Sequence, residues 1–130
     1  FIYKKLQDLN YVYSTSTTSL DMYWSGAIFK KNDIIEIPLT GSYNKPHIIL
    51  DSWNFMHSES KQFKNNDYYQ EIKKVIEYFY NNNTMSIINI YVDPSHANNW
   101  ESFLESMKLF KDFKKINYLE LSKNFKNNLL

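Results

Sequence analysis

Two aspartates and a histidine follow two apolar runs of the sequence, at positions where functional sites are common in parallel sheets. Asp51 follows the apolar run 47–50, and Asp93 and His96 follow the longer apolar run 86–92. If both runs are parallel strands, their carboxyl ends meet at one edge of the sheet, where ligands bind. Two carboxylates and an imidazole at such an edge could hold a divalent metal or perform acid–base catalysis. Aspartate beside serine or proline also caps turns, so we favour capping and keep a small metal-dependent hydrolase as the alternative.

Large apolar side chains crowd residues 52–66, a segment that otherwise has the polar composition of a loop. Aromatic residues and methionine are enriched at the centres of protein interfaces, although they also fill cores. The segment contains an imidazole and a carboxylate two residues apart, but no second histidine at the spacing of a metal motif. We therefore predict no catalytic residue here, and a partner-binding surface on which at least two of the four large apolar side chains are exposed. Its predicted residues are Trp53, Phe55, Met56, His57, Glu59 and Phe63.

The composition argues against several classes of functional site. The 130 residues contain no arginine, no cysteine and two glycines. A phosphate-binding loop needs glycines that let the backbone approach the anion, and a zinc ribbon or redox pair needs thiolates. We therefore expect no cofactor and no metal. Fifteen lysines against fourteen acidic residues leave a net charge of +1. Without the bidentate grip of arginine on phosphate and guanine, a nucleic-acid partner is not expected.

Hydropathy and residue usage bear on the setting in which the protein works. No segment approaches eighteen consecutive apolar residues, so no membrane-spanning segment is expected and the protein should be soluble. Lack of cysteine does not distinguish a reducing cytosol from a disulfide-free secreted domain, and we expect the cytoplasm. Lysine in place of arginine, with abundant asparagine, isoleucine and tyrosine, is typical of small accessory genes of AT-rich bacteria and mobile elements.

Helices and strands must position these side chains. Helical spacing of apolar residues predicts helices over 1–9, over 67–80 and from residue 98 onward. Alternating or continuous apolar runs bounded by turn residues predict strands, with a polar hairpin loop at 30–33. The run 86–92 is the strongest and is predicted to be the central strand. The predicted strands are 11–13, 20–24, 27–29, 34–39, 47–50, 86–92 and 116–121.

The order of these elements predicts an α+β fold. We expect one domain over residues 1–130, with a mixed β-sheet covered by two or three helices. An antiparallel meander forms the N-terminal part of that sheet, and a β-α-β-α-β unit forms the C-terminal part. The helix over 67–80 should pack on the sheet.

Together these features predict a small, non-catalytic protein-binding module. An immunity or antitoxin-like protein that sequesters a dedicated toxin partner fits the size, the aromatic surplus and the residue usage. One feature counts against an inhibitor of a nuclease, because proteins that cover a cationic site are usually acidic and this chain is not. A nucleic-acid-binding accessory protein is the second alternative, after the metal-dependent hydrolase.

Overall fold

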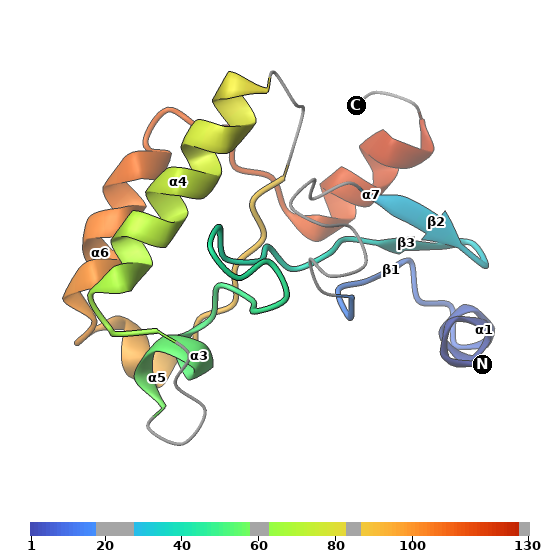
Figure 1. The fold of residues 1–130 in the computed structure, drawn as a ribbon. Coiled ribbons are helices and arrows are strands. Elements are labelled where there is room, and N and C mark those ends of the chain that lie inside the picture. The colour runs from blue at the N-terminus through green and yellow to red at the C-terminus, as the bar shows by residue number, and fades with distance from the viewer. Residues whose placement is uncertain (18–27, 58–62, 83–86, 128–130) are drawn as a thin grey trace.

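The structure, a computed structural model, describes residues 1–17, 28–57, 63–82 and 87–127 (Figure 1). It has the predicted α+β architecture, with a small mixed sheet toward one end and packed helices toward the other. The described elements in chain order are α1 (Ile2–Asp8), β1 (Tyr13–Ser14), β2 (Phe29–Lys31), β3 (Ile34–Glu36), α3 (Ser52–Met56), α4 (Asp67–Asn81), α5 (Pro94–Ala97), α6 (Glu101–Met107), the 3₁₀ helix η2 (Lys108–Phe110) and α7 (Tyr118–Lys126).

A β-hairpin forms the antiparallel half of the sheet. β2 and β3 pair antiparallel, and Asn32 and Asp33 connect them with φ angles of 50° and 63°. Positive φ at both central residues is the type I′ geometry, whose twist matches that of the paired strands. Asparagine and aspartate tolerate this region better than other residues with a Cβ atom. Lys30 forms an ion pair of 2.6 Å with Asp33 across the turn. The predicted hairpin around residues 30–33 is confirmed.

β1 completes the sheet on the other side of β3. It pairs with β3 in parallel, so the strand order is β1-β3-β2. The Ile35 N–H donates to the Val12 carbonyl at 3.1 Å, and the Ile37 N–H donates to the Ser14 carbonyl at 2.9 Å. Backbone groups of successive residues alternate between the two sides of a strand. The N–H and C=O of Tyr13 therefore point away from β3, along the outer edge of the sheet.

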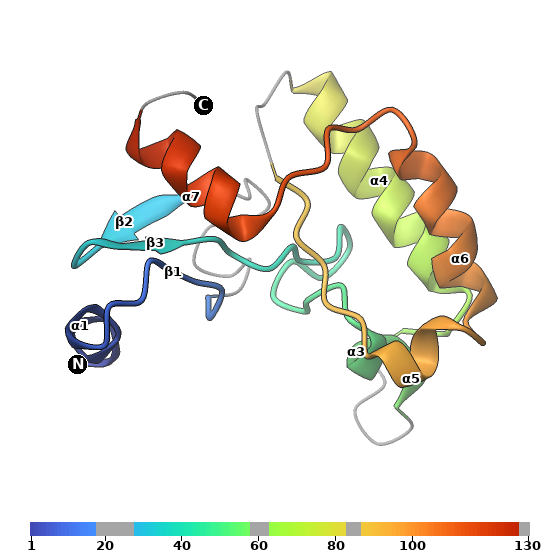
Figure 2. The ribbon, with the colours of Figure 1, turned by 180° about the vertical axis from the view of Figure 1, so that it is seen from behind.

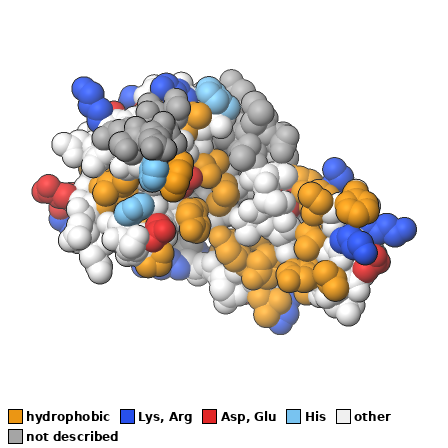
Figure 3. Space-filling view, turned by 90° about the horizontal axis from the view of Figure 1, so that it is seen from below, with side chains coloured by type: hydrophobic (Ala, Val, Ile, Leu, Met, Phe, Trp, Pro, Cys, Tyr) orange, Lys and Arg blue, Asp and Glu red, His pale blue; other side chains and the backbone are white. Residues whose placement is uncertain are grey.

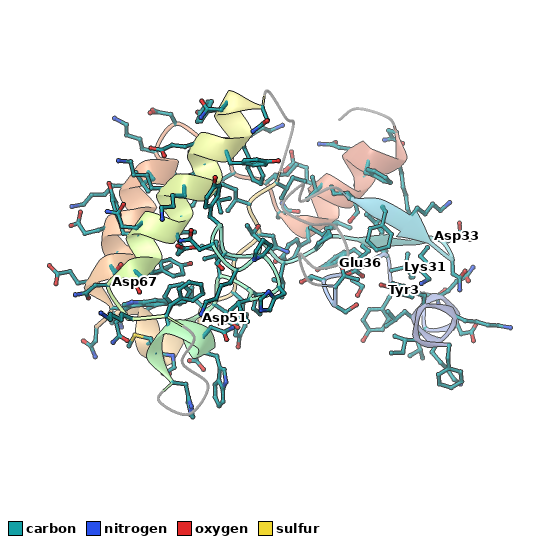
Figure 4. All side chains as sticks on the ribbon, viewed as in Figure 1. Tyr3, Lys31, Asp33, Glu36, Asp51 and Asp67 are labelled. Carbon is teal, nitrogen blue, oxygen red and sulfur yellow. The ribbon has the colours of Figure 1, made fainter. Side chains whose placement is uncertain are left out.

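Different helices cover the two faces of the sheet. Side chains alternate along a strand, so Ile35 and Ile37 share one face, where they are buried with Leu121 of α7. Glu36 lies on the other face, beside α1, and its carboxylate accepts a hydrogen bond of 3.2 Å from the Tyr3 hydroxyl (Figure 4). The helix predicted over 1–9 is confirmed as α1, but α1 has no buried residue.

The fully buried carboxylate of Glu36 ties the segment after β1 to the sheet. It accepts hydrogen bonds from the backbone N–H of Ser16 at 2.6 Å and of Thr17 at 2.7 Å, and from the Thr17 hydroxyl at 2.9 Å. Burial opposes ionisation, but the hydrogen bonds outweigh it and hold the pKa of Glu36 below its usual value. An ionised carboxylate is stable here because its oxygens are well supplied with donors.

The larger core lies between helices. The helix predicted over 67–80 is confirmed as α4, but it packs on α6 and α3 rather than on the three-stranded sheet. Both ribbon views show α4 and α6 side by side (Figures 1 and 2). Trp100 precedes α6 and its indole N–H donates to the Asn65 carbonyl at 3.0 Å. The buried residues of this core are Leu50, Phe55, Tyr68, Ile72, Val75, Ile76, Phe79 and Trp100.

The predicted central strand over 86–92 is wrong in its described part. Residues 87–92 make one isolated parallel bridge, Tyr91 with Asp51, and residues 47–50 make one isolated antiparallel bridge, Ile49 with Gly41. The described run passes between two cores: Ile87 packs on the sheet core, whereas Ile88 and Ile90 pack on the helical core. Most described residues of both runs are partly buried, and none belongs to a ladder.

Buried Asn89 explains why this run does not extend the sheet. Its side-chain amide donates to the carbonyls of Ile37 and Pro38, both at 3.2 Å, and its Oδ1 accepts from the Tyr118 hydroxyl at 2.7 Å. Proline has no N–H to donate to a neighbouring strand. Beyond Ile37, the chain can therefore continue a ladder on one of its two sides but not on both. The side chain of Asn89 takes up the carbonyls there and links β3 to α7.

The strand predicted over 116–121 is also wrong, because α7 occupies most of it. Asn117 caps the helix by accepting from the Glu120 N–H at 2.9 Å, and the two residues stand at capping-box spacing. Leu121 and Phe125, four residues apart, pack on the sheet core from one face of α7. The helix predicted from residue 98 begins at Glu101 and continues into η2.

The strand predicted over 20–24 lies outside the described residues. None of the helices in the described parts of the chain has the length and apolar character needed to cross a lipid bilayer.

Candidate functional site

Two short helices meet at the end of the molecule away from the sheet (Figure 1). Asp51 caps α3 by accepting from the N–H and the side-chain amide of Asn54, both at 2.8 Å. Asp93 caps α5 by accepting from the N–H of Ser95 at 2.8 Å and from its hydroxyl at 2.7 Å. The Ser52 hydroxyl accepts from the Asp93 N–H at 2.9 Å and joins the two helices.

We call this region the α3–α5 corner and define it by Asp51, Trp53, His57, Asp93 and His96. The two aspartates lie near each other, because Asp51 bridges in parallel to Tyr91, two residues before Asp93. Each carboxylate is engaged as a helix cap, which is the structural interpretation that the sequence favoured.

The two aspartates have opposite electrostatic environments. Burial raises the pKa of Asp51, although the hydrogen bonds from Asn54 offset part of this effect. The hydrogen bonds from Ser95 lower the pKa of Asp93, and the nearby His96 adds to that lowering. Asp51 is therefore the carboxylate whose charge is disfavoured, and Asp93 the one whose charge is stabilised.

The corner does not assemble a ligand set for a metal ion. Within residues 1–17, 28–57, 63–82 and 87–127, no group of three or more histidine, aspartate or glutamate side chains could hold one. Asp51, Asp93 and His96 do not form such a group.

The exposed element of the corner is an aromatic pair on α3. The indole of Trp53 stacks on the imidazole of His57, with ring centroids 3.7 Å apart and an interplanar angle of 15°. The residues are one helical turn apart and therefore share a face. Trp53 is 51% exposed and His57 is half-buried. Figure 3 views the molecule from this end and shows histidine and apolar side chains intermingled on the surface.

The other predicted partner-binding residues lie deeper. Phe55 is fully buried, stacks on Phe63 at 4.7 Å between ring centroids and meets Tyr68 edge to face. Met56 and Phe63 are partly buried against the same core. Of the four large apolar residues, only Trp53 is exposed, so the prediction of at least two is wrong, as is the assignment of Phe55 to the surface. Glu59 lies outside the described residues.

Helix geometry accounts for this division. Successive residues of an α-helix are rotated by about 100°, so Trp53 and Phe55 point to nearly opposite sides of α3. The cap at Asp51 and the burial of Ser52 fix which side faces the core. The polar composition of the segment indicated a loop, so this rotation was not predicted. The sequence did contain one signal for the start of a helix, because Asp51 is of a residue type that is preferred at the N-cap position.

Several polar atoms near the corner are buried without a hydrogen-bond partner among the described residues. They are Nδ1 of His57, Nδ1 of His96, the hydroxyl of Tyr68 and Oδ1 of Asn65. Burial, and secondarily the charge of Asp51, raise the pKa of the Tyr68 hydroxyl above its usual value. The Trp53 side chain, in contrast, is exposed.

A second exposed apolar surface was not predicted. Leu9 is 66% exposed and Leu119 is 47% exposed, and both line a groove of about 500 Å³ together with Tyr11. The groove lies between α1 and α7 along the outer edge of β1. The signal for it was the apolar spacing of residues 1–9, which predicted an amphipathic helix without showing that its apolar face is left uncovered. The groove is lined by Leu6, Leu9, Asn10, Tyr11, Val12, Tyr13, Ser14, Thr15 and Leu119.

Comparison with protein-family models, with curated proteins and with solved structures gave no significant match.

Proposed function

We propose that this chain is a small protein-binding module that docks one protein partner on the α3–α5 corner. The observation that carries the proposal is the exposure of Trp53 on a helix whose opposite side is anchored in the core. Phe55, two residues further on, is fully buried, and Asp51 fixes the start of the helix. Trp53 therefore projects from a rigid base.

The energetics of interfaces support this use of Trp53. Tryptophan is among the residues most enriched at binding hot spots, where truncation to alanine costs roughly 2 kcal/mol or more. A side chain already held by stacking, here on His57, loses little conformational entropy when a partner covers it. Tyr91 is also exposed and its backbone pairs with Asp51, so a second aromatic ring lies close to the corner.

The charge of the chain limits the kind of partner. A net charge of +1 provides little long-range attraction toward a strongly charged surface. We infer that affinity comes from apolar and aromatic contact instead. An immunity or antitoxin-like protein that sequesters a toxin domain is the specific form of the proposal that fits the small size and the residue usage of accessory genes.

The test uses the product of the gene next to the one that encodes this chain, because sequestering proteins are commonly encoded beside their targets. Isothermal titration calorimetry should detect a complex, and Trp53→Ala should weaken it about 30-fold. Tyr80→Ala is the matched control, because Tyr80 is an exposed aromatic residue on α4 that lies outside the corner. That variant should bind as the native protein does.

Two results would contradict the proposal. Equal affinities of the native protein and the Trp53→Ala variant would remove the corner from the interface. Absence of binding by the products of both neighbouring genes would contradict the immunity-like form. Thermal unfolding of Trp53→Ala should remain close to that of the native protein, since substitutions at exposed positions usually have small effects.

A further inference from the structure

We propose that two copies of this chain associate through the outer edges of their β1 strands, with Tyr13 of one copy opposite Tyr13 of the other. This inference concerns the groove between α1 and α7 and is independent of the α3–α5 corner. It would join two three-stranded sheets into one continuous sheet of six strands.

The backbone of Tyr13 carries the first step. Its N–H and C=O both point away from β3, because the neighbouring residues Val12 and Ser14 supply the carbonyls that bond to β3. None of the hydrogen bonds among the described residues uses these two groups. Open edge strands pair readily with another strand. A twofold axis through Tyr13 lets the two copies exchange both N–H···O=C bonds, as directly opposed residues do in an antiparallel pair.

The helices on either side of the edge carry the second step. A twofold axis perpendicular to the sheet places α7 beside its copy on one face and α1 beside its copy on the other. Leu119 of α7 then approaches the same residue of the second copy, and Leu9 of α1 does likewise. Burial of apolar surface on both faces stabilises such a contact, whereas a short strand edge alone does not.

Charge is compatible with a second copy as the occupant. All nine residues that line the groove are uncharged, and the cores of protein interfaces are depleted of charged residues. The net charge of +1 adds little repulsion between copies. In a twofold dimer the same uncharged surface of each copy contacts the other, and a symmetric interface requires such a self-complementary surface.

Sedimentation velocity of the native protein tests the association. The average mass should rise from 15.7 kDa toward twice that value as the concentration is raised from about 5 to about 500 µM, a range that covers weak dimers. Leu119→Glu should raise the dissociation constant at least about tenfold, because it places two carboxylates face to face at the interface. Leu104→Glu is the matched control, since Leu104 is 48% exposed on α6 and lies outside the groove. It should leave the dissociation constant unchanged.

A second measurement distinguishes strand pairing from unspecific association. Hydrogen exchange at the Tyr13 amide should slow as the protein concentration rises, because pairing protects that N–H. Tyr13→Pro removes the N–H and should abolish the dimer, whereas Tyr13→Ala keeps it and should retain more association. Circular dichroism checks that each variant is folded. A protein that stays monomeric over the whole range, or a dimer unaffected by Leu119→Glu, would overturn the proposal.

Discussion

At the scale of single residues, Asp51 combines a useful hydrogen-bond acceptor with an unfavourable charge. Its carboxylate caps α3, and burial raises its pKa above the ordinary value of 3.8. Asp51→Asn keeps a side-chain oxygen that can accept from the Asn54 N–H and removes the buried charge. We expect this variant to be as stable as the native protein or more stable at pH 7. Asp51→Ala should lose about 1 kcal/mol with the cap, and urea unfolding measures both.

The pH dependence of this difference follows from the sign of the shift. Since the pKa of Asp51 is higher in the folded state, the folded state binds the proton more tightly than the unfolded state. The cost of the ionised carboxylate is therefore present at neutral pH and disappears as the pH falls through the raised pKa. The advantage of Asp51→Asn should shrink between pH 7 and pH 4. If Asp51→Asn were as unstable as Asp51→Ala at pH 7, the charge itself would be what holds the helix.

At the scale of elements, the run containing Asn89 decides how the two cores are joined. The side chain makes hydrogen bonds to the carbonyls of Ile37 and Pro38 and to the hydroxyl of Tyr118. Asn89→Ala would leave the carbonyls of Ile37 and Pro38 without their amide donor, which costs about 1–3 kcal/mol for each group that water cannot reach. We expect a loss of about 3 kcal/mol in the free energy of unfolding, measured in urea.

Ile90→Ala serves as the comparison for that experiment. Ile90 is partly buried against the helical core and belongs to no strand, so its truncation should cost less than the 2–5 kcal/mol typical of a full core position. The larger cost would apply if residue 90 lay in the interior of a central strand, as the apolar run 86–92 predicted. A greater loss from Ile90→Ala than from Asn89→Ala would mean that packing, and not the asparagine, holds this crossing.

The elements also show what a single sequence can and cannot determine. The hairpin and α4 were predicted because turn residues and helical periodicity act locally. The runs 86–92 and 116–121 were misassigned because short apolar runs fit a strand or a covered coil or helix equally well. The capping spacing of Asn117 was present in the sequence but was given less weight than the apolar run. At the site, capping by Asp51 and Asp93 was the favoured interpretation, because aspartate beside serine or proline commonly caps turns.

The burial of each side chain in the α3–α5 corner could not be predicted from local sequence patterns. Whether Trp53 or Phe55 faces solvent depends on how α3 is rotated against α4, and Phe63 contributes to that packing from a distance of eight residues. Such long-range contacts leave no periodic pattern in the segment itself.

At the scale of the whole molecule, the two proposed surfaces lie toward opposite ends (Figures 1 and 2). The α3–α5 corner belongs to the helical half, and the open edge of β1 belongs to the half with the sheet. Pairing of two copies through β1 therefore leaves both corners free. Such a dimer would be bivalent, and bivalence strengthens binding to a partner that is itself paired without any new contact.

The two hydrophobic cores also differ in how far apart their residues lie along the chain. The helical core is built from the middle of the sequence, from Tyr43 to Phe113. The sheet core joins Tyr13 and Ile35 near the start to Leu121 and Phe125 near the end. Bringing distant segments together costs more loop-closure entropy, so the sheet half should open more readily than the helical half.

Native-state hydrogen exchange would reveal this as two levels of amide protection. We expect the amides of α4 to exchange only through global unfolding, and those of β3 and α7 to exchange together through a smaller opening that releases both ends of the chain while its middle stays folded. Identical protection of Ile72 and Leu121, both buried, would instead indicate one cooperative unit. If the smaller opening occurs, the run through Asn89 would separate two regions of different stability. The sheet half could then open while the helical half stays folded.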